Sequence, residues 1–138
     1  MEFTVKDWMV NLVVYIDPSS TVMEALTLMR RRYIHSLIVN KTNDNPEYGI
    51  ITSTDISDKI VALDKNPTGV LVREIMTSPF MSVTSSMSLK ECATIMNKHS
   101  IHHLPVADEG GNLVGLISDT DFLVAAEAMG RAPGERLV

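Results

Sequence analysis

Residues 49–55 read GIITSTD and residues 115–121 read GLISDTD, and this near-repetition decides the fold. A shift of 67 residues extends it, because ten of the 35 positions aligned between 5–39 and 72–106 are identical. Chance would give about two identities at ordinary residue frequencies of roughly 5–7% each. The shift changes by one residue between 40–47 and 107–113, where Asn, Asp, Pro and Gly are typical of loops. The chain therefore contains two copies of one unit.

Each copy predicts the same order of elements. A short helical turn (5–9, 72–76) and a short strand (12–16, 80–83) precede a helix that starts with a Ser/Thr-x-x-Glu capping box. Two apolar strands follow, at 37–39 and 48–52 or at 104–106 and 113–118, and a second helix begins near Asp55 or Asp121. A β-α-β-β-α unit present twice predicts an α+β fold. The predicted domains are repeat 1 (1–64), a linker (65–71), repeat 2 (72–130) and a C-terminal tail (131–138).

Three finer expectations concern the helices. The apolar stripe of the first long helix ends at Tyr33, which predicts that this ring faces the core. Gly130 directly follows the last helix and is expected to be its C′ glycine. Cys92 lies on the apolar stripe of the corresponding helix in the second copy and is expected to be inert.

Composition narrows the functional classes. The chain has 138 residues and a formal net charge of −5, which disfavours non-specific binding to nucleic acid. No apolar run approaches the ~18 residues that a membrane span needs, and the N-terminus lacks the pattern of a signal peptide. A single cysteine, Cys92, excludes an intramolecular disulfide. These features predict a cytoplasmic protein without membrane insertion.

The ordered motifs resemble a tandem CBS (cystathionine-β-synthase) domain pair, also called a Bateman module. The motifs are a Val-x-x-x-Met lead-in, an Ile-His-x-Leu-(Pro)-Val strand entry and a Gly-h-h-Ser/Thr-x-Thr-Asp turn, where h is apolar. The resemblance covers residues 5–129 and is closest to the stand-alone CBS domain proteins. It implies two repeats packed about a pseudo-twofold axis, with clefts that bind adenosine nucleotides or S-adenosylmethionine. It also implies regulation rather than catalysis.

The carboxylates at the helix starts have two interpretations. On the residues alone, a hydroxyl followed three positions later by Asp favours a simple N-cap. A carboxylate can also accept hydrogen bonds from both hydroxyls of a ribose. The resemblance gives this second role to Asp55 and Asp121, with Thr52 and Ser118 in support.

The resemblance also implies phosphate and adenine contacts. The phosphate positions are His35, Ser36, His102 and His103. Neither histidine pattern is followed by Arg, which departs from the strongest phosphate-binding form of the family. The preceding helices end in cations that either supply the positive charge or complement the helix dipole and stay solvated: Arg30, Arg31, Arg32, Lys98 and His99. The residues that the resemblance implies for the adenine contact are Val13, Val14, Ile34, Phe80, Met81 and Ile101. A purely structural role of these six residues in the core is an equal alternative.

These observations predict a regulatory module that senses AMP, ADP or ATP, requires no cofactor and acts on an unidentified enzyme or transporter. We also expect a homodimer through the apolar helix 122–129; the alternative is a monomer whose tail, 131–138, covers that face. Three other interpretations stay open: an S-adenosylmethionine sensor, an interaction module with degenerate pockets, and a zinc site built from His35, His99, His102 and His103. No motif of a hydrolase or phosphate-binding loop supports an enzyme.

Overall fold

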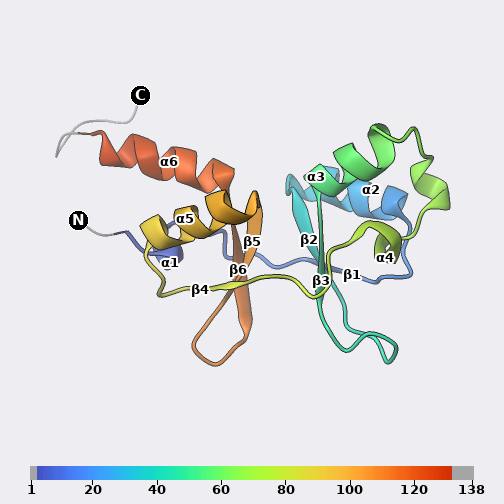
Figure 1. Cartoon of the computed structure of the whole chain (residues 1–138), viewed down its shortest axis with the longest axis horizontal. Helices are drawn as coiled ribbons and strands as arrows, with labels where there is room; N and C mark the ends of the chain where they lie inside the picture. The colour runs from blue at the N-terminus through green and yellow to red at the C-terminus, as the bar shows by residue number, and fades with distance from the viewer. Residues whose placement is uncertain (1–2, 132–138) are drawn as a thin grey trace. The chain divides into compact units, whose positions relative to one another are not determined.

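A computed structural model describes residues 3–131, which belong to two compact units (Figure 1). Unit A consists of residues 13–81. Unit B combines the N-terminal residues up to 12 with the chain from 82 onward. The monomer alternative places the C-terminal tail over the last helix, and residues 132–138 of this tail lie outside the described residues.

Unit A contains a three-stranded sheet in the order β1-β2-β3. Strand β1 is parallel to β2, and β2 is antiparallel to β3 with Ile38 opposite Ile50. Helix α2 connects the two parallel strands. The elements are β1 (Tyr15–Ile16), α2 (Val22–Arg32), β2 (Ser36–Val39), β3 (Gly49–Thr52), α3 (Ser53–Ile56), a π-helical turn η1 (Ser57–Val61), a 3₁₀ turn η2 (Pro67–Gly69) and α4 (Val72–Ile75).

Unit B repeats this arrangement with the order β4-β5-β6. The registers are equivalent, since the pair Ile16–Val39 of unit A corresponds to Val83–Val106 of unit B. The elements are α1 (Val5–Trp8), β4 (Val83–Thr84), α5 (Leu89–His99), β5 (His103–Ala107), β6 (Leu113–Ser118) and α6 (Asp119–Met129). The predicted α+β class and the two-fold repetition of the unit are therefore confirmed.

The N-caps of the long helices agree with the sequence prediction, but two predicted details at the C-terminal ends of helices are wrong. The hydroxyl of Thr21 accepts a hydrogen bond from the backbone N–H of Glu24 at 3.1 Å, as the N-cap motif predicts. Tyr33 is 92% exposed, because the chain leaves α2 through this residue in the left-handed conformation (φ 55°) and turns the ring away from the core. Gly130 caps α6 in the right-handed conformation (φ −85°), so it is not a left-handed C′ glycine.

The short lead-in helices are exchanged between the repeats. Val5 of α1 is fully buried in the core of unit B, whereas Val72 of α4 is fully buried in the core of unit A. Leu89 N–H donates to the carbonyl of Phe3 at 2.8 Å, and the equivalent bond in unit A joins Val22 to Val70 at the same distance. The folded units thus differ from the continuous stretches 1–64 and 72–130, because each lead-in fills the core of the other repeat.

The glycine of the repeated motif makes room for this exchange. A Cβ at Gly115 would lie 2.4 Å from the carbonyl oxygen of Val10, which bridges to Leu116. At the equivalent Gly49 a Cβ would lie 2.8 Å from Sδ of Met76, next to the bridge between Ile50 and Thr77. The motif therefore begins with glycine because the lead-in backbone crosses each strand at close range.

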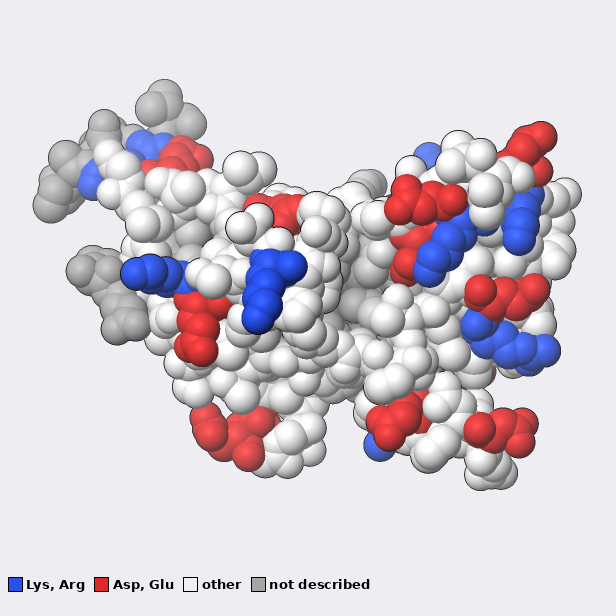
Figure 2. Space-filling view, viewed as in Figure 1, with Lys and Arg blue, Asp and Glu red and all other residues white. Residues whose placement is uncertain are grey.

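Charged side chains of both signs lie on the surface. On the face shown in Figure 2, basic and acidic side chains are interspersed among large uncharged areas. In the described part of the chain, no helix combines the length and the apolar character that crossing a bilayer requires.

Candidate functional site

A pocket of about 750 Å³ in unit A lies beside one of the predicted phosphate-binding histidines. It forms where the end of α2, the entry to β2 and the start of α3 meet. Arg30 and Arg31 line it, and no carboxylate does, so the pocket favours an anion. Its lining residues are Leu26, Met29, Arg30, Arg31, Tyr33, Ile34, His35, Ser53 and Ile56.

The predicted ribose residues of unit A form a reciprocal helix cap next to this pocket. Backbone N–H and Oγ1 of Thr52 both donate to Oδ2 of Asp55, at 2.9 and 3.1 Å, and the N–H of Asp55 donates to Oγ1 at 3.2 Å. Nζ of Lys59 donates to Oδ1 of Asp55 at 3.1 Å and to the carbonyl of Ile75 at 2.8 Å. Both oxygens of Asp55 are thus engaged, and a ribose would have to compete with Lys59.

The corresponding carboxylate of unit B is less occupied. Oδ2 of Asp121 accepts from the backbone N–H of Ser118 at 2.8 Å and from its hydroxyl at 3.4 Å. The position of Lys59 is taken by Ala125, which cannot pair with a carboxylate. Burial raises the pKa of Asp121 above its ordinary value of 3.8, and the hydrogen bonds from Ser118 oppose this shift. Unit B therefore has no counterpart of the Lys59–Asp55 pair at this position.

The two predicted histidines have different neighbours. In unit B, Nδ1 of His102 lies 2.6 Å from Oδ2 of Asp119. The residue at the position of Asp119 in unit A is Ser53, which lines the pocket together with His35. The backbone contact is the same in both units: Ser53 N–H donates to the carbonyl of His35 at 2.8 Å, and Asp119 N–H donates to the carbonyl of His102 at 3.2 Å.

The structure brings some of the other predicted residues to the pocket and leaves others elsewhere. Ile34 lines the pocket, whereas Ser36 is buried at the start of β2, opposite Thr52. His103 is half-buried at the start of β5, opposite Ser118.

Of the six residues of the predicted adenine wall, only Ile34 lines this pocket. Val14 is part of the unit A core and Ile101 packs against the unit B core, which agrees with their alternative role as core residues. Val13 is half-buried and Met81 is exposed. Phe80 stacks on Tyr48, with ring centroids 6.4 Å apart. Tyr48 directly precedes β3 and Thr52 ends it, so these two residues are roughly 13 Å apart along the strand.

Sequence reasoning missed several lining residues. Ser53 and Ile56 come from α3, and the exposed Tyr33 was expected in the core. The signal that could have found Ser53 was the internal alignment, because the pair Ser53 and Asp119 is the only charge difference inside the repeated seven-residue motif.

Two further observations concern the zinc alternative and the single thiol of the chain. Within residues 3–131, no three His, Cys, Asp or Glu side chains are grouped closely enough to hold a metal ion. Cys92 is fully buried, and burial raises the pKa of its thiol to about 11, so it stays protonated at neutral pH.

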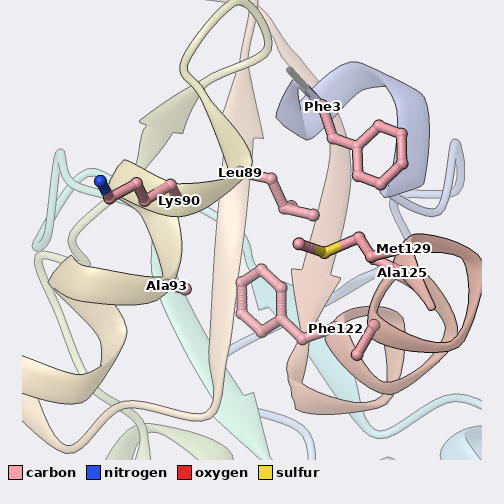
Figure 3. A pocket seen from close by; sticks show the side chains of 8 residues that line it. Phe3, Leu89, Lys90, Ala93, Phe122, Ala125 and Met129 are labelled. Carbon is pink, nitrogen blue, oxygen red and sulfur yellow. The ribbon is translucent and has the colours of Figure 1, made fainter. Parts of the chain in front are cut away.

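A second hollow, of about 510 Å³, lies in unit B and is almost entirely apolar. Figure 3 shows Phe3, Leu89, Phe122 and Met129 pointing toward it from the N-terminal lead-in, α5 and α6. Leu123, Val124 and Met129 of α6 are at least half exposed. This apolar groove is suited to another protein surface rather than to a polar ligand.

Comparison with known proteins establishes the family. The CBS domain model matches residues 5–62 and 72–128, so the chain belongs to the CBS domain family and contains two such domains in tandem. The CBS domain-containing protein YhcV of Bacillus subtilis is 30% identical over 121 residues, which are 88% of this chain and 84% of YhcV. An uncharacterised protein of Methanopyrus kandleri is 35% identical over 78% of this chain, but the match spans only 54% of that protein.

Solved structures share the fold. A hexameric CBS-CP12 protein from bloom-forming cyanobacteria has a TM-score of 0.85 and 31% identity over 99% of this chain and 74% of its own. The CBS domain pair of protein MJ0100, solved in complex with 5′-methylthioadenosine and S-adenosyl-L-methionine, has a TM-score of 0.78 and 25% identity over 94% of this chain and 99% of its own. Hypoxic Response Protein I, with two coordinated zinc ions, has a TM-score of 0.65 and 25% identity over 88% of this chain and 98% of its own.

Proposed function

We propose that this CBS domain pair is a regulatory sensor that binds an adenosine-containing ligand of the AMP, ADP or ATP type and transmits its presence to an enzyme or transporter. The observation that carries the proposal is the pocket of unit A, which joins two arginines, His35 and the apolar Ile34 next to the cap formed by Thr52 and Asp55. Cations suit phosphate, the carboxylate suits ribose hydroxyls, and apolar side chains suit a base.

The ribose contacts of the proposal fall on Thr52 and Asp55 in unit A and on Ser118 and Asp121 in unit B. The complex of MJ0100 supports an adenosine compound as the ligand, and it keeps S-adenosylmethionine as the alternative. The proposal contains no catalytic step and needs no cofactor. A cytoplasmic location is part of it, supported by the buried thiol of Cys92, which forms no disulfide.

A thermal-shift screen tests the proposal. A ligand that binds only the native state adds about 2.7 kcal/mol of stability at 100 times its Kd, so millimolar AMP, ADP, ATP or S-adenosylmethionine should raise the Tm clearly. Stabilisation by zinc alone would contradict the proposal and favour a metal site. No response to any adenosine compound would leave the interaction module as the function.

We also propose that the apolar groove of unit B and the exposed face of α6 bind a second copy of the chain. Leu123 is 72% exposed and Met129 is 69% exposed, although both are large apolar residues. Light scattering at micromolar concentration should give twice the 15.2 kDa of one chain, and Leu123→Asp should restore the single-chain mass. A single-chain mass for the wild type would contradict the homodimer.

A further inference from the structure

The clearest difference between the two candidate sites is the side chain beside each histidine. Ser53 and Asp119 make the same backbone hydrogen bond to the carbonyl of His35 and His102, respectively, so they occupy equivalent positions. Only the side chain differs: a neutral hydroxyl lines the pocket of unit A, and a carboxylate occupies the same position in unit B.

The carboxylate of Asp119 changes what its site can accept. Its Oδ2 lies 2.6 Å from Nδ1 of His102, so it takes the hydrogen bond that this nitrogen would otherwise offer to a ligand. A carboxylate only accepts hydrogen bonds, and its negative charge repels a phosphate. Both side chains are more than half exposed, so the pair adds little to stability, and its main effect is on the charge of the site.

The end of the preceding helix makes the same distinction. Arg30 and Arg31 line the pocket of unit A, and their counterparts in unit B are Asn97 and Lys98. Together with Ser53 these positions carry a formal charge of +2 in unit A, from two arginines. With Asp119 they carry a charge of zero in unit B, because one lysine offsets one carboxylate. Arginine also matches phosphate geometrically, since its planar fork donates two parallel hydrogen bonds.

We infer that the two sites divide adenosine ligands by charge. The site of unit A takes a phosphorylated ligand, and the site of unit B takes an adenosine compound without phosphate, such as a nucleoside or a sulfonium derivative. The inference rests on the proposed function, because it requires that both repeats bind adenosine. It adds which ligand charge each repeat accepts, and it makes one chain able to hold two different ligands at once.

Calorimetric titration of the whole chain with AMP and with adenosine tests the inference. The wild type should bind about one AMP per chain and about two molecules of adenosine. Asp119→Ser should add a second AMP site, whereas Ser53→Asp should weaken AMP binding roughly tenfold or more at the first site, because a new carboxylate faces the phosphate. Adenosine binding should change less than AMP binding in both variants.

Thr54→Asp is the matched control, because Thr54 is an exposed neighbour of Ser53 that does not line the pocket. A loss of AMP affinity in this control equal to that in Ser53→Asp would overturn the inference. Two equal AMP sites in the wild type, or unchanged AMP binding in Ser53→Asp, would also overturn it while leaving the proposed function intact. Failure of both AMP and adenosine to bind would overturn the proposed function and the inference together.

Discussion

In unit A, the end of α2 presents Arg30 and Arg31 to a pocket beside His35, whereas in unit B the equivalent helix end has Asn97 and Lys98. The contrast continues at the carboxylates proposed to bind ribose: Asp55 is paired with Lys59, and Asp121 has Ala125 in place of that lysine. At these three positions unit A thus has two arginines and a lysine, whereas unit B has a single lysine.

The positions that hold the backbone show no such divergence. The glycines at 49 and 115 admit the crossing lead-in, and Asp55 and Asp121 both close a reciprocal cap on the preceding Thr or Ser. The duplicated fold therefore constrains residues that support the main chain, while side chains around the pocket are free to differ in charge. Four predictions sharpen or break this comparison.

The largest effect is expected from adding one methyl group at each motif glycine. Gly115→Ala should lower the free energy of unfolding by about 3 kcal/mol, because its Cβ would lie 2.4 Å from the backbone oxygen of Val10. Gly49→Ala should cost only about 1 kcal/mol, since the nearest atom is Sδ of the flexible Met76 at 2.8 Å. Urea denaturation measures both, and a larger cost for Gly49→Ala would show that the two crossings are not packed as described.

The carboxylates distinguish a helix cap from a ribose contact. Asp121→Ala should weaken adenosine binding at one site by about 1.5–3 kcal/mol, or roughly 10- to 150-fold, and Asp55→Ala should do the same at the other site. Asp55→Ala should also destabilise the fold more, because it leaves Lys59 without its ion pair.

Titration calorimetry with circular dichroism as the folding check measures this effect. Asp58→Ala removes an exposed carboxylate from the same region and serves as the control. Wild-type affinity in a folded double variant lacking both Asp55 and Asp121 would assign these residues to capping alone.

The exchanged lead-ins can be probed by cavities in each core. Val5→Ala and Val72→Ala should each cost about 2 kcal/mol, since both valines are fully buried. Hydrogen exchange should locate the loss: Val5→Ala should speed exchange in β4, β5 and β6, and Val72→Ala should speed it in β1, β2 and β3. Faster exchange of β1, β2 and β3 in Val5→Ala alone would mean that α1 packs on its own repeat.

The smallest effect concerns the pH dependence of unit B. Because burial raises the pKa of Asp121, the native state keeps this proton at pH values where the unfolded chain has lost it. The stability of the wild type relative to Asp121→Asn should therefore fall as the pH rises from 3.8 to the raised pKa, and stay level above it. Urea denaturation across pH 3.5–6.5 measures the difference, and a rise over that window would show that the hydrogen bonds from Ser118 outweigh burial.

The repetition in the sequence was sufficient to predict the element order, the α+β class and the family. It succeeded because the apolar strand segments, the hydroxyl N-caps at Thr21 and Ser88 and the motif glycines are local signals that recur in both copies. The prediction for Tyr33 was wrong for a physical reason. The apolar periodicity of the sequence extends to Tyr33, but α2 ends before this residue, which adopts the left-handed conformation.

The site was only partly predictable. His35 and Ile34, which the family motif singles out, line the same pocket. The ion pair between Asp55 and Lys59 was not expected, although its i,i+4 spacing is visible in the sequence. The exchange of lead-ins was also unpredictable from the sequence. Val5 and Val72 are identical residues at equivalent positions, so the pattern does not indicate which of the two apolar cores each valine fills.

The exchange of lead-ins gives the two units different histories during synthesis. Unit A is one continuous stretch and can complete its core once residue 81 has left the ribosome. Unit B needs α1, which is made first, and α6, which ends at residue 129. At about 5–20 residues per second, the chain from α1 to the end of α6 takes roughly 6–25 s to make. During that interval Val5 and Trp8 have no core to pack into. A chain whose synthesis stops early therefore contains a folded unit A and a lead-in whose apolar side chains are exposed to aggregation.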